Sequence, residues 1–304
     1  MEIMRLAAEY YHGRLSSDKY KFAYEFLRIK RGLNPRTIKN HLLGWSDGTA
    51  CNMLLNSGYT HDELIASGIM DKTGRDALRN VITIAYQLNG NVVDIRAKDI
   101  AGKYKTLPGH SGRPYNIDSV QGETVVVVCE GEFDALVAEQ LGYASIGVPG
   151  STNWQESWNS YLSNVKKVYI VFDADKAGVE GAEKTADKIG SKARIVSLPD
   201  DVPGVDLSDW IVVHGHLKEE FDMLLAEARG GILVTAEEAY QDWMENEGNP
   251  DRTGLKFGLP HLDEVITPGF LPGQVMIILA KTGGRKNSCW FEFVSSYDRR
   301  EAGH

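Results

Sequence analysis

The regular alternation of strand and helix patterns between residues 123 and 198 constrains the fold of this chain more than any other feature. The run VVVVC at 125–129 is unbroken and β-branched, which is typical of a strand buried on both faces. Short apolar segments recur at 144–148, 167–172 and 193–198, and helical patterns such as EFDALVAEQLG separate them. A strand–helix series of this kind predicts a parallel, doubly wound sheet and therefore an α/β fold.

The residues before this series have a different pattern. Residues 5–45 favour helices, and two β-rich segments within 80–98 flank Asn89-Gly90, a strong signal for a tight hairpin turn. A mixed α+β subdomain is therefore expected ahead of the parallel sheet. The predicted organisation is a basic N-terminal subdomain at 1–121, an acidic α/β domain at 122–215, a linker with helical character at 216–255 and a separate C-terminal piece at 256–304.

The net charge of −9 hides an uneven distribution along the chain. Residues 1–121 carry 17 Lys and Arg against 12 Asp and Glu, whereas residues 122–215 carry 7 against 15 and residues 216–304 carry 9 against 15. The total charge alone argues against a nucleic-acid partner. A basic module joined to an acidic one is nevertheless compatible with such a partner.

Cysteine usage and hydropathy limit the cellular compartment. The three cysteines, Cys51, Cys129 and Cys289, form no C-x-x-C pair, which excludes a disulfide framework and a zinc ribbon within this sequence. No apolar run approaches the roughly 18–20 residues that a membrane span requires, and the N-terminal segment lacks the apolar core of a signal peptide. A reducing, cytoplasmic location with no membrane partner and no bound zinc is expected.

Acidic residues follow the predicted parallel strands. Glu130 comes directly after VVVVC, Asp173 and Asp175 follow KVYIVF, and Asp206 and Asp209 follow the last strand by a short loop. The carboxyl ends of parallel strands line the functional crevice of an open sheet, so these side chains are expected to gather there. Clustered carboxylates repel one another, and oxygen ligands favour Mg²⁺ or Mn²⁺ over zinc. The pattern predicts a divalent-cation site.

The segments VCEGEFDALVAEQLG, VYIVFDADKAG and LPDDVPGVDLSDW together resemble a TOPRIM domain, the metal-binding module shared by DnaG-type primases, topoisomerases and some nucleases. The resemblance implies that Glu130, Asp173 and Asp175 are catalytic metal ligands and that Asp206 is a further acidic ligand. Asp134 completes the E-G-x-x-D motif, and two roles stay open for it: a metal ligand, or a charge that favours the helix N-terminus.

Residues 5–108 are similar to the N-terminal half of the DnaG-type polymerase domain, which shows Y-L-x-x-R-G-L, a hairpin with R-x-R-I-x-F-P-I and a K-Y-x-N motif. The corresponding segments here are FLRIKRGL, RNVITIAYQLNGNVVDIRA and KYKTLP. The resemblance implies that Arg79, Arg96 and Lys103 neutralise template phosphates and the incoming triphosphate. It also implies that Tyr104 stacks on a base.

The combined resemblance implies a DNA primase, an RNA polymerase core that joins ribonucleoside triphosphates into short RNA primers on single-stranded DNA with two Mg²⁺ or Mn²⁺ ions. It points to a bacterial or phage-encoded protein, similar to the primase part of phage or prophage primase–helicases. Two alternatives stay open: a weakly active or non-catalytic protein that binds single-stranded DNA or the replisome, and a TOPRIM nuclease. Without a zinc ribbon, the expected partners are a separate zinc module or a replicative helicase, and a monomer is expected.

The segment GLKFGLPHLDEVITPGFLPGQVMIILAKTGGRKN resembles the beginning of a RecA-type hexameric helicase core. Its Walker A loop needs G/A-x-x-x-x-G-K-[ST], and Ala280 and Lys286 stand in register. Arg285 replaces the glycine and Asn287 the hydroxyl residue, so no helicase or ATPase activity is expected. If the original loop read A-K-T-G-V-G-K-T, one inserted base near codon 284 would produce the observed Gly-Gly-Arg-Lys-Asn. Residues 288–304 would then be translated out of frame. The alternative is a divergent loop or an engineered end, and the nucleotide sequence distinguishes them.

Overall fold

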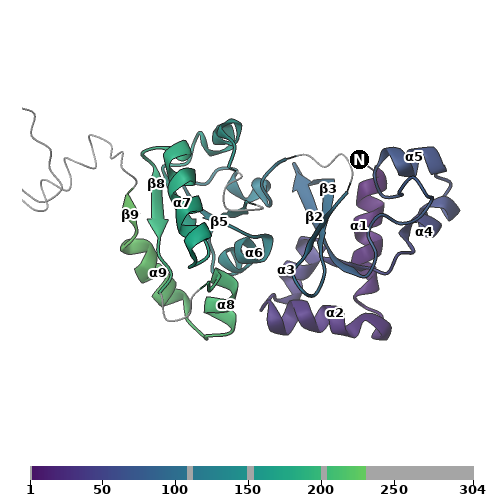
Figure 1. Ribbon diagram of the computed structural model, residues 1–304, viewed down its shortest axis with the longest axis horizontal. Coiled ribbons are helices and arrows are strands. Elements are labelled where there is room, and N and C mark those ends of the chain that lie inside the picture. Colours follow the sequence, from purple (N-terminus) through teal and green to yellow (C-terminus); the bar gives the residue numbers. More distant parts are fainter. Residues whose placement is uncertain (1, 108–111, 149–153, 200–203, 231–304) are drawn as a thin grey trace, which may run out of the picture. The chain divides into compact units, whose positions relative to one another are not determined.

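The computed structural model describes residues 2–107, 112–148, 154–199 and 204–230, all of which belong to one compact unit spanning Met1–Thr235 (Figure 1). The C-terminal piece predicted at 256–304, with Ala280 and Lys286 of its altered P-loop, lies outside the described residues. Within the described ranges, no helix is long and apolar enough to cross a bilayer.

A four-stranded antiparallel sheet of order β1-β2-β3-β4 forms the centre of the N-terminal subdomain. The predicted hairpin is confirmed, because Asn89 and Gly90 connect two antiparallel strands with positive φ angles of 51° and 72°, as a two-residue type I′ turn requires. The stretch after this hairpin contributes the short edge strand β4. The strands are β1 (Gly44–Ser46), β2 (Val81–Leu88), β3 (Asn91–Lys98) and β4 (Tyr104–Thr106).

Short helices surround this sheet, and local sequence signals explain where several of them begin. The Asn34 side chain accepts a hydrogen bond from the Thr37 amide, and Pro35 occupies the first helical position, so α3 begins there. Thr60 and Glu63 form a reciprocal capping box at the start of α5. The helices are α1 (Glu2–Arg14), η1 (Asp18–Tyr20), α2 (Lys21–Glu25), α3 (Pro35–Asn40), α4 (Ala50–Asn56) and α5 (His61–Ala66).

A π-helical turn, η2 (Phe26–Lys30), continues α2. The related pattern Y-L-x-x-R-G-L has two residues between Leu and Arg, whereas Leu27 and Arg31 have three residues between them. A π-helical turn accommodates one extra residue without ending the helix. Leu27 therefore stays fully buried while the exposed fraction of Ile29 is 74%.

The second sheet has the order β6-β5-β7-β8-β9, and its first four strands are parallel. This confirms the predicted α/β fold with a parallel sheet. Because β6 and β7 lie on opposite sides of β5, the chain reverses its direction of winding beside the carboxyl end of β5, where open α/β sheets bind their ligands. The strands are β5 (Val125–Cys129), β6 (Ser145–Gly147), β7 (Lys167–Val171), β8 (Ala193–Val196) and β9 (Arg229–Gly230).

Helices cover this sheet, and the helical region extends farther along the chain than expected. The segment WQESWNSYLS contains a 3₁₀ helix, η4. The linker expected from residue 216 begins with α9, whose Phe221 is fully buried against Tyr143 and Trp210, and β9 then pairs antiparallel with β8. The fold therefore continues past residue 215. The helices are η3 (Ile117–Val120), α6 (Glu132–Gln140), η4 (Glu156–Leu162), α7 (Lys176–Ile189), α8 (Leu207–Val212) and α9 (Lys218–Ala226).

One apolar core joins the two sheets. Leu27, Leu33 and Ile38 of the N-terminal helices belong to the same buried cluster as Val127 and Leu136 of the parallel-sheet domain. Gly32 allows a close approach at this junction, because a Cβ on Gly32 would lie 2.3 Å from a Val212 methyl carbon. Burial of apolar surface on this scale makes the junction part of the folded core rather than a flexible connection.

Candidate metal centre

The predicted acidic residues lie at the carboxyl edge of the parallel sheet. Strands β5 and β7 are hydrogen-bonded neighbours, and Cys129 at the end of β5 pairs with Val171 at the end of β7. Glu130 follows the first strand directly, and Asp173 follows the second after one buried residue, Phe172. The register therefore brings Glu130 and Asp173 to the same edge, as the sequence predicted.

Asp175 is the N-cap of α7. Its Oδ1 accepts a hydrogen bond from the Gly178 amide at 2.7 Å, which satisfies one of the unpaired amides of the first helical turn. Gly178 packs against the backbone of Asp173, since a Cβ on this glycine would lie 2.1 Å from the Asp173 carbonyl oxygen. The glycine of D-x-D-x-A-G thus lets the helix start immediately beside the first aspartate.

Asp206 occupies the corresponding position on α8. Its Oδ1 accepts from the Asp209 amide at 2.6 Å, and its Oδ2 lies 3.7 Å from a guanidinium nitrogen of Arg31. The loop before it is fixed to the D-x-D segment, because the Ala174 amide donates to the Val205 carbonyl at 3.0 Å. Asp206 therefore lies beside Asp173 and Asp175 despite the sequence separation.

Asp134 bridges two helices. The side chain is buried in the first turn of α6, and its Oδ1 accepts a hydrogen bond from the Ser208 amide of α8 at 3.0 Å. Neither of the two roles left open by the sequence includes this contact. Asp134 thereby fixes the helix that carries Asp206 against the helix that follows Glu130.

Burial and mutual repulsion raise the pKa values of Asp134, Asp173 and Asp206. Burial is the largest cause for Asp173, followed by the charges of Asp134 and Glu130, and together they raise the pKa of Asp173 to about 8. Burial and the charge of Asp134 raise the pKa of Asp206 to about 7. Burial likewise raises the pKa of Asp134. Carboxylates that repel in this way gain most from a divalent cation placed among them.

The chemistry of the donors fits Mg²⁺ or Mn²⁺. All the candidate ligands are carboxylates, which hard divalent cations prefer. The N-cap hydrogen bond of Asp175 uses one oxygen and leaves the second for coordination, whereas the second oxygen of Asp206 faces Arg31. Among the described residues, no three His, Cys, Asp or Glu side chains lie close enough together to form a ready-made metal site. The carboxylates therefore need to draw together around an ion.

The predicted nucleic-acid residues divide into two groups. Arg79 and Lys103 are exposed on the N-terminal subdomain, and Arg79 lies 3.6 Å from an Asp71 oxygen. Arg96 is buried, with its guanidinium carbon 4.3 Å from the centre of the Tyr86 ring. Tyr104 is partly exposed, and its hydroxyl donates to Glu132 at 2.5 Å. The structure thus brings Arg96 and Tyr104 to the face of the sheet that meets α6, and leaves Arg79 and Lys103 outside.

Three charged residues near the acidic edge were not singled out from the sequence. Arg31 lies beside Asp206, Lys98 lies 3.2 Å from Glu132, and Glu132 is the second glutamate of E-G-E. The alternation of Asp94, Arg96 and Lys98 along β3 puts them on one face, which was a usable signal for Lys98. Only the tertiary fold reveals the partner of Glu132.

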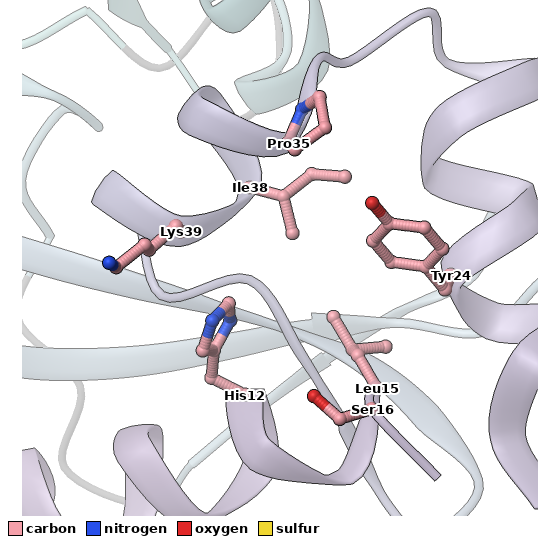
Figure 2. A pocket seen from close by; sticks show the side chains of 7 residues that line it. All are labelled: His12, Leu15, Ser16, Tyr24, Pro35, Ile38 and Lys39. Atoms are coloured by element: carbon pink, nitrogen blue, oxygen red, sulfur yellow. The ribbon is translucent and has the colours of Figure 1, made fainter. Parts of the chain in front are cut away.

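A separate hollow lies in the N-terminal subdomain. Figure 2 shows His12, Leu15, Tyr24 and Ile38 converging on it. The His12 ring is fixed by a 2.7 Å hydrogen bond between Nδ1 and the Leu43 carbonyl. No carboxylate lines this hollow, so it offers none of the oxygen donors found at the edge of the parallel sheet.

Known proteins are similar to this chain in sequence. Residues 127–211 match the family described as Toprim-like. The chain is 32% identical over 121 residues to the Gene 57 protein of Mycobacterium phage D29, an alignment that covers 40% of this chain and 77% of that protein. It is 24% identical over 260 residues to a DNA primase of Synechocystis sp., which covers 75% of this chain and 40% of that protein. The chain thus spans less than half the length of the Synechocystis primase.

Solved structures share the fold. The RNA polymerase domain of Mycobacterium tuberculosis primase DnaG, in complex with a double-stranded DNA oligomer with a 6-nucleotide overhang, has a TM-score of 0.65 at 21% identity, covering 75% of this chain and 79% of that chain. A DnaG primase catalytic domain bound to single-stranded DNA has a TM-score of 0.63 at 20% identity, covering 81% and 82%. With the Toprim-like match and the phage and Synechocystis relatives, the chain belongs to the family of DnaG-type TOPRIM primases.

Proposed function

We propose that this chain is a primase-type nucleotidyltransferase that joins ribonucleoside triphosphates into short RNA primers on single-stranded DNA. The observation that carries the proposal is the acidic edge of the parallel sheet, in which Glu130, Asp173, Asp175 and Asp206 gather from separate elements. Burial and neighbouring carboxylates raise the pKa of Asp173 to about 8, which means that its ionised form destabilises the folded protein. Carboxyl groups with strongly shifted pKa values are typical of functional sites. The Synechocystis DNA primase and the DnaG core bound to single-stranded DNA support this reaction and this template.

In this proposal the carboxylates of Glu130, Asp173, Asp175 and Asp206 hold the divalent cations. Two Mg²⁺ or Mn²⁺ ions, when bound, would lower the pKa of the primer 3′-hydroxyl and offset the charge of the triphosphate. The N-caps of α7 and α8 orient Asp175 and Asp206, so the ligands keep their direction before the ions arrive.

The N-terminal subdomain would hold the template. Its basic balance and the exposed side chains of Arg79 and Lys103 suit contacts with phosphates. Arg96 is buried against Tyr86, so its contribution would be to support the sheet from within. Tyr104 keeps part of its ring exposed and remains a candidate for stacking on a base.

Synthesis of RNA is the direct test. The purified chain is incubated with single-stranded DNA, labelled ribonucleoside triphosphates and Mg²⁺ or Mn²⁺, alongside a variant with Asp173→Asn and Asp175→Asn. Metal-dependent RNA that disappears in this variant supports the proposal. Asp187→Asn is the matched control, because Asp187 is exposed on α7 outside the acidic edge, and it should retain synthesis.

The same assay distinguishes the alternatives. DNA binding without RNA would indicate a binding protein, and shortened DNA would indicate a nuclease. A zinc-ribbon protein or a replicative helicase is then added to the reaction, since either is a candidate partner for template selection. RNA that is absent with every metal and every partner would refute the proposal.

A further inference from the structure

Glu132 is a fully buried carboxylate between the two sheets. A buried carboxylate is costly unless charged or hydrogen-bonding partners surround it. The N-terminal sheet supplies three such partners. Lys98 Nζ lies 3.2 Å from Oε2, the Tyr104 hydroxyl donates to the same oxygen at 2.5 Å, and the Tyr86 hydroxyl donates to Oε1 at 2.8 Å. Glu132 therefore connects β2, β3 and the edge strand β4 to the start of α6.

Aromatic rings surround Lys98 on the same face of the sheet. Lys98 pairs with Tyr104 across β3 and β4, and its ammonium lies 4.1 Å from the centre of the Tyr104 ring. The ring centre of Phe133 lies 5.2 Å from the same ammonium. Such contacts favour a cation when solvent is largely excluded, and only 14% of the Lys98 side chain is exposed. The ammonium group is thus held in one place.

That place borders the acidic edge. A Cβ built on Gly131 would lie 2.6 Å from Asp134 Oδ2 and 3.8 Å from Lys98 Nζ, so both groups approach the same backbone position. Gly131 is also the residue between Glu130 and Glu132. Lys98 therefore has Glu132 on one side and Asp134, the buried carboxylate next to the candidate metal centre, on the other. Glu132 makes the salt bridge with Lys98, whose charge also opposes the burial-driven rise in the pKa of Asp134.

We infer that Lys98 binds the phosphates of the incoming nucleotide and that Glu132 is its positioning residue. The inference rests on the proposed function, because the nucleotide is the substrate of that reaction. An ammonium group carries three N–H donors, and one carboxylate does not exhaust them. By holding Lys98 beside the rings of Tyr104 and Phe133, Glu132 keeps its charge near the metal edge and limits its pairing with Asp134. In this arrangement Glu132 itself is engaged by three donors and does not serve as a metal ligand.

Nucleotide binding tests the role of Lys98. Lys98→Met should weaken equilibrium binding of a fluorescent ATP analogue about tenfold or more, as removal of a charged phosphate ligand does, and Lys98→Arg should recover part of it. In primer synthesis the KM for ATP should rise more than kcat falls. The inference fails if Lys98→Met binds the analogue as the wild type does.

Mn²⁺ binding, measured by calorimetry without substrate, tests the role of Glu132. Glu132→Gln should weaken Mn²⁺ binding about fivefold, because the released Lys98 then pairs with the acidic edge and competes with the ion. The double variant Lys98→Met/Glu132→Gln should recover Mn²⁺ binding but not nucleotide binding. A purely structural pair would instead leave Mn²⁺ binding unchanged in Glu132→Gln, or recover both ligands together in the double variant, and either result overturns the inference.

Glu139→Gln is the matched control. Glu139 lies on the same helix and also reaches the N-terminal subdomain, through a 2.9 Å contact with His41, but it is seven residues farther along α6. Glu139→Gln should lower the free energy of unfolding but leave the binding of both Mn²⁺ and the ATP analogue unchanged. If the wild type makes no RNA, the proposed function fails, while the Mn²⁺ series still decides whether Glu132 restrains Lys98.

Discussion

Gly178 lies so close to Asp173 that a Cβ on the glycine would stand 2.1 Å from the Asp173 carbonyl oxygen. The neighbouring atom is backbone, so no side-chain rotation relieves the overlap. The same glycine donates its amide to Asp175, so one residue fixes both aspartates of the D-x-D segment. The first turn of α7 therefore contacts both aspartates directly and belongs to the acidic edge.

Gly178→Ala should consequently displace the start of α7. We expect a loss of about 1–3 kcal/mol in the free energy of unfolding, as for other overpacked sites, together with loss of primer synthesis. Urea unfolding followed by circular dichroism measures the first effect. Gly13→Ala is the control, because nothing lies within 4 Å of a Cβ at this position in α1, and it should be neutral or stabilise the protein by about 0.5–1 kcal/mol. Equal behaviour of the two variants would contradict the packing argument.

The metal-free protein should become less stable as the pH rises. The pKa of Asp173 is about 8 in the folded protein because of burial and then of repulsion by Asp134, whereas an unfolded aspartate titrates near about 3.9. Between these values the folded state holds a proton that the unfolded state has lost. The contribution of Asp173 to the free energy of unfolding therefore falls between about pH 4 and pH 8. Asp206, with its pKa of about 7, acts in the same direction up to that pH.

Urea unfolding in EDTA at pH 5, 6.5 and 8 measures this dependence. Asp173→Asn cannot ionise, so its free energy of unfolding should fall less with pH than that of the wild type, and the variant should be the more stable protein at pH 8. Asp187→Asn should follow the wild-type curve. Parallel curves for the wild type and Asp173→Asn would show that Asp173 is not held protonated by its surroundings.

The sequence was sufficient to predict the parts of the site that depend on neighbouring residues. The strand run 125–129 and the position of Glu130 follow from local pattern, and the pairing of β5 with β7 explains why Asp173 reaches the same edge. The caps made by Asp175 and Asp206 are also local, since each accepts from the amide three residues later. Strand alternation and helix capping involve residues only a few positions apart, so both can be recognised in the sequence before the fold is known.

The parts that the sequence did not predict depend on contacts between distant segments. The partners of Glu132 are 28 to 46 residues away, at Tyr104 and Tyr86, and nothing in E-G-E distinguishes the glutamate that is buried from the one at the edge. The two-residue strand β9 has too little sequence to show a period, and its pairing with β8 comes from the tertiary fold. Arg31 reaches Asp206 only because the N-terminal helices pack onto the parallel-sheet domain.

Stabilisation by Mn²⁺ should depend on pH. Protons on Asp173 and Asp206 compete with the ion, because their pKa values of about 8 and about 7 leave both largely protonated at pH 6. Thermal unfolding should therefore show a larger increase in Tm on adding Mn²⁺ at pH 7.5 than at pH 6. Asp187→Asn should respond as the wild type does. An equal increase in Tm at both pH values would indicate that Mn²⁺ is not bound by Asp173 and Asp206.

Arg79 and Lys103 should bind phosphates of single-stranded DNA. Both are exposed on the basic N-terminal subdomain, and removing one such positive charge should make the slope of log affinity against log salt concentration shallower by about 0.7. Fluorescence anisotropy with a labelled oligonucleotide at several salt concentrations measures the slope for Arg79→Ala and Lys103→Ala. Lys184→Ala removes an equally exposed charge from α7, outside that subdomain, and should leave the slope unchanged. If only Lys184→Ala changed the slope, the DNA phosphates would contact the parallel-sheet domain and not the N-terminal subdomain.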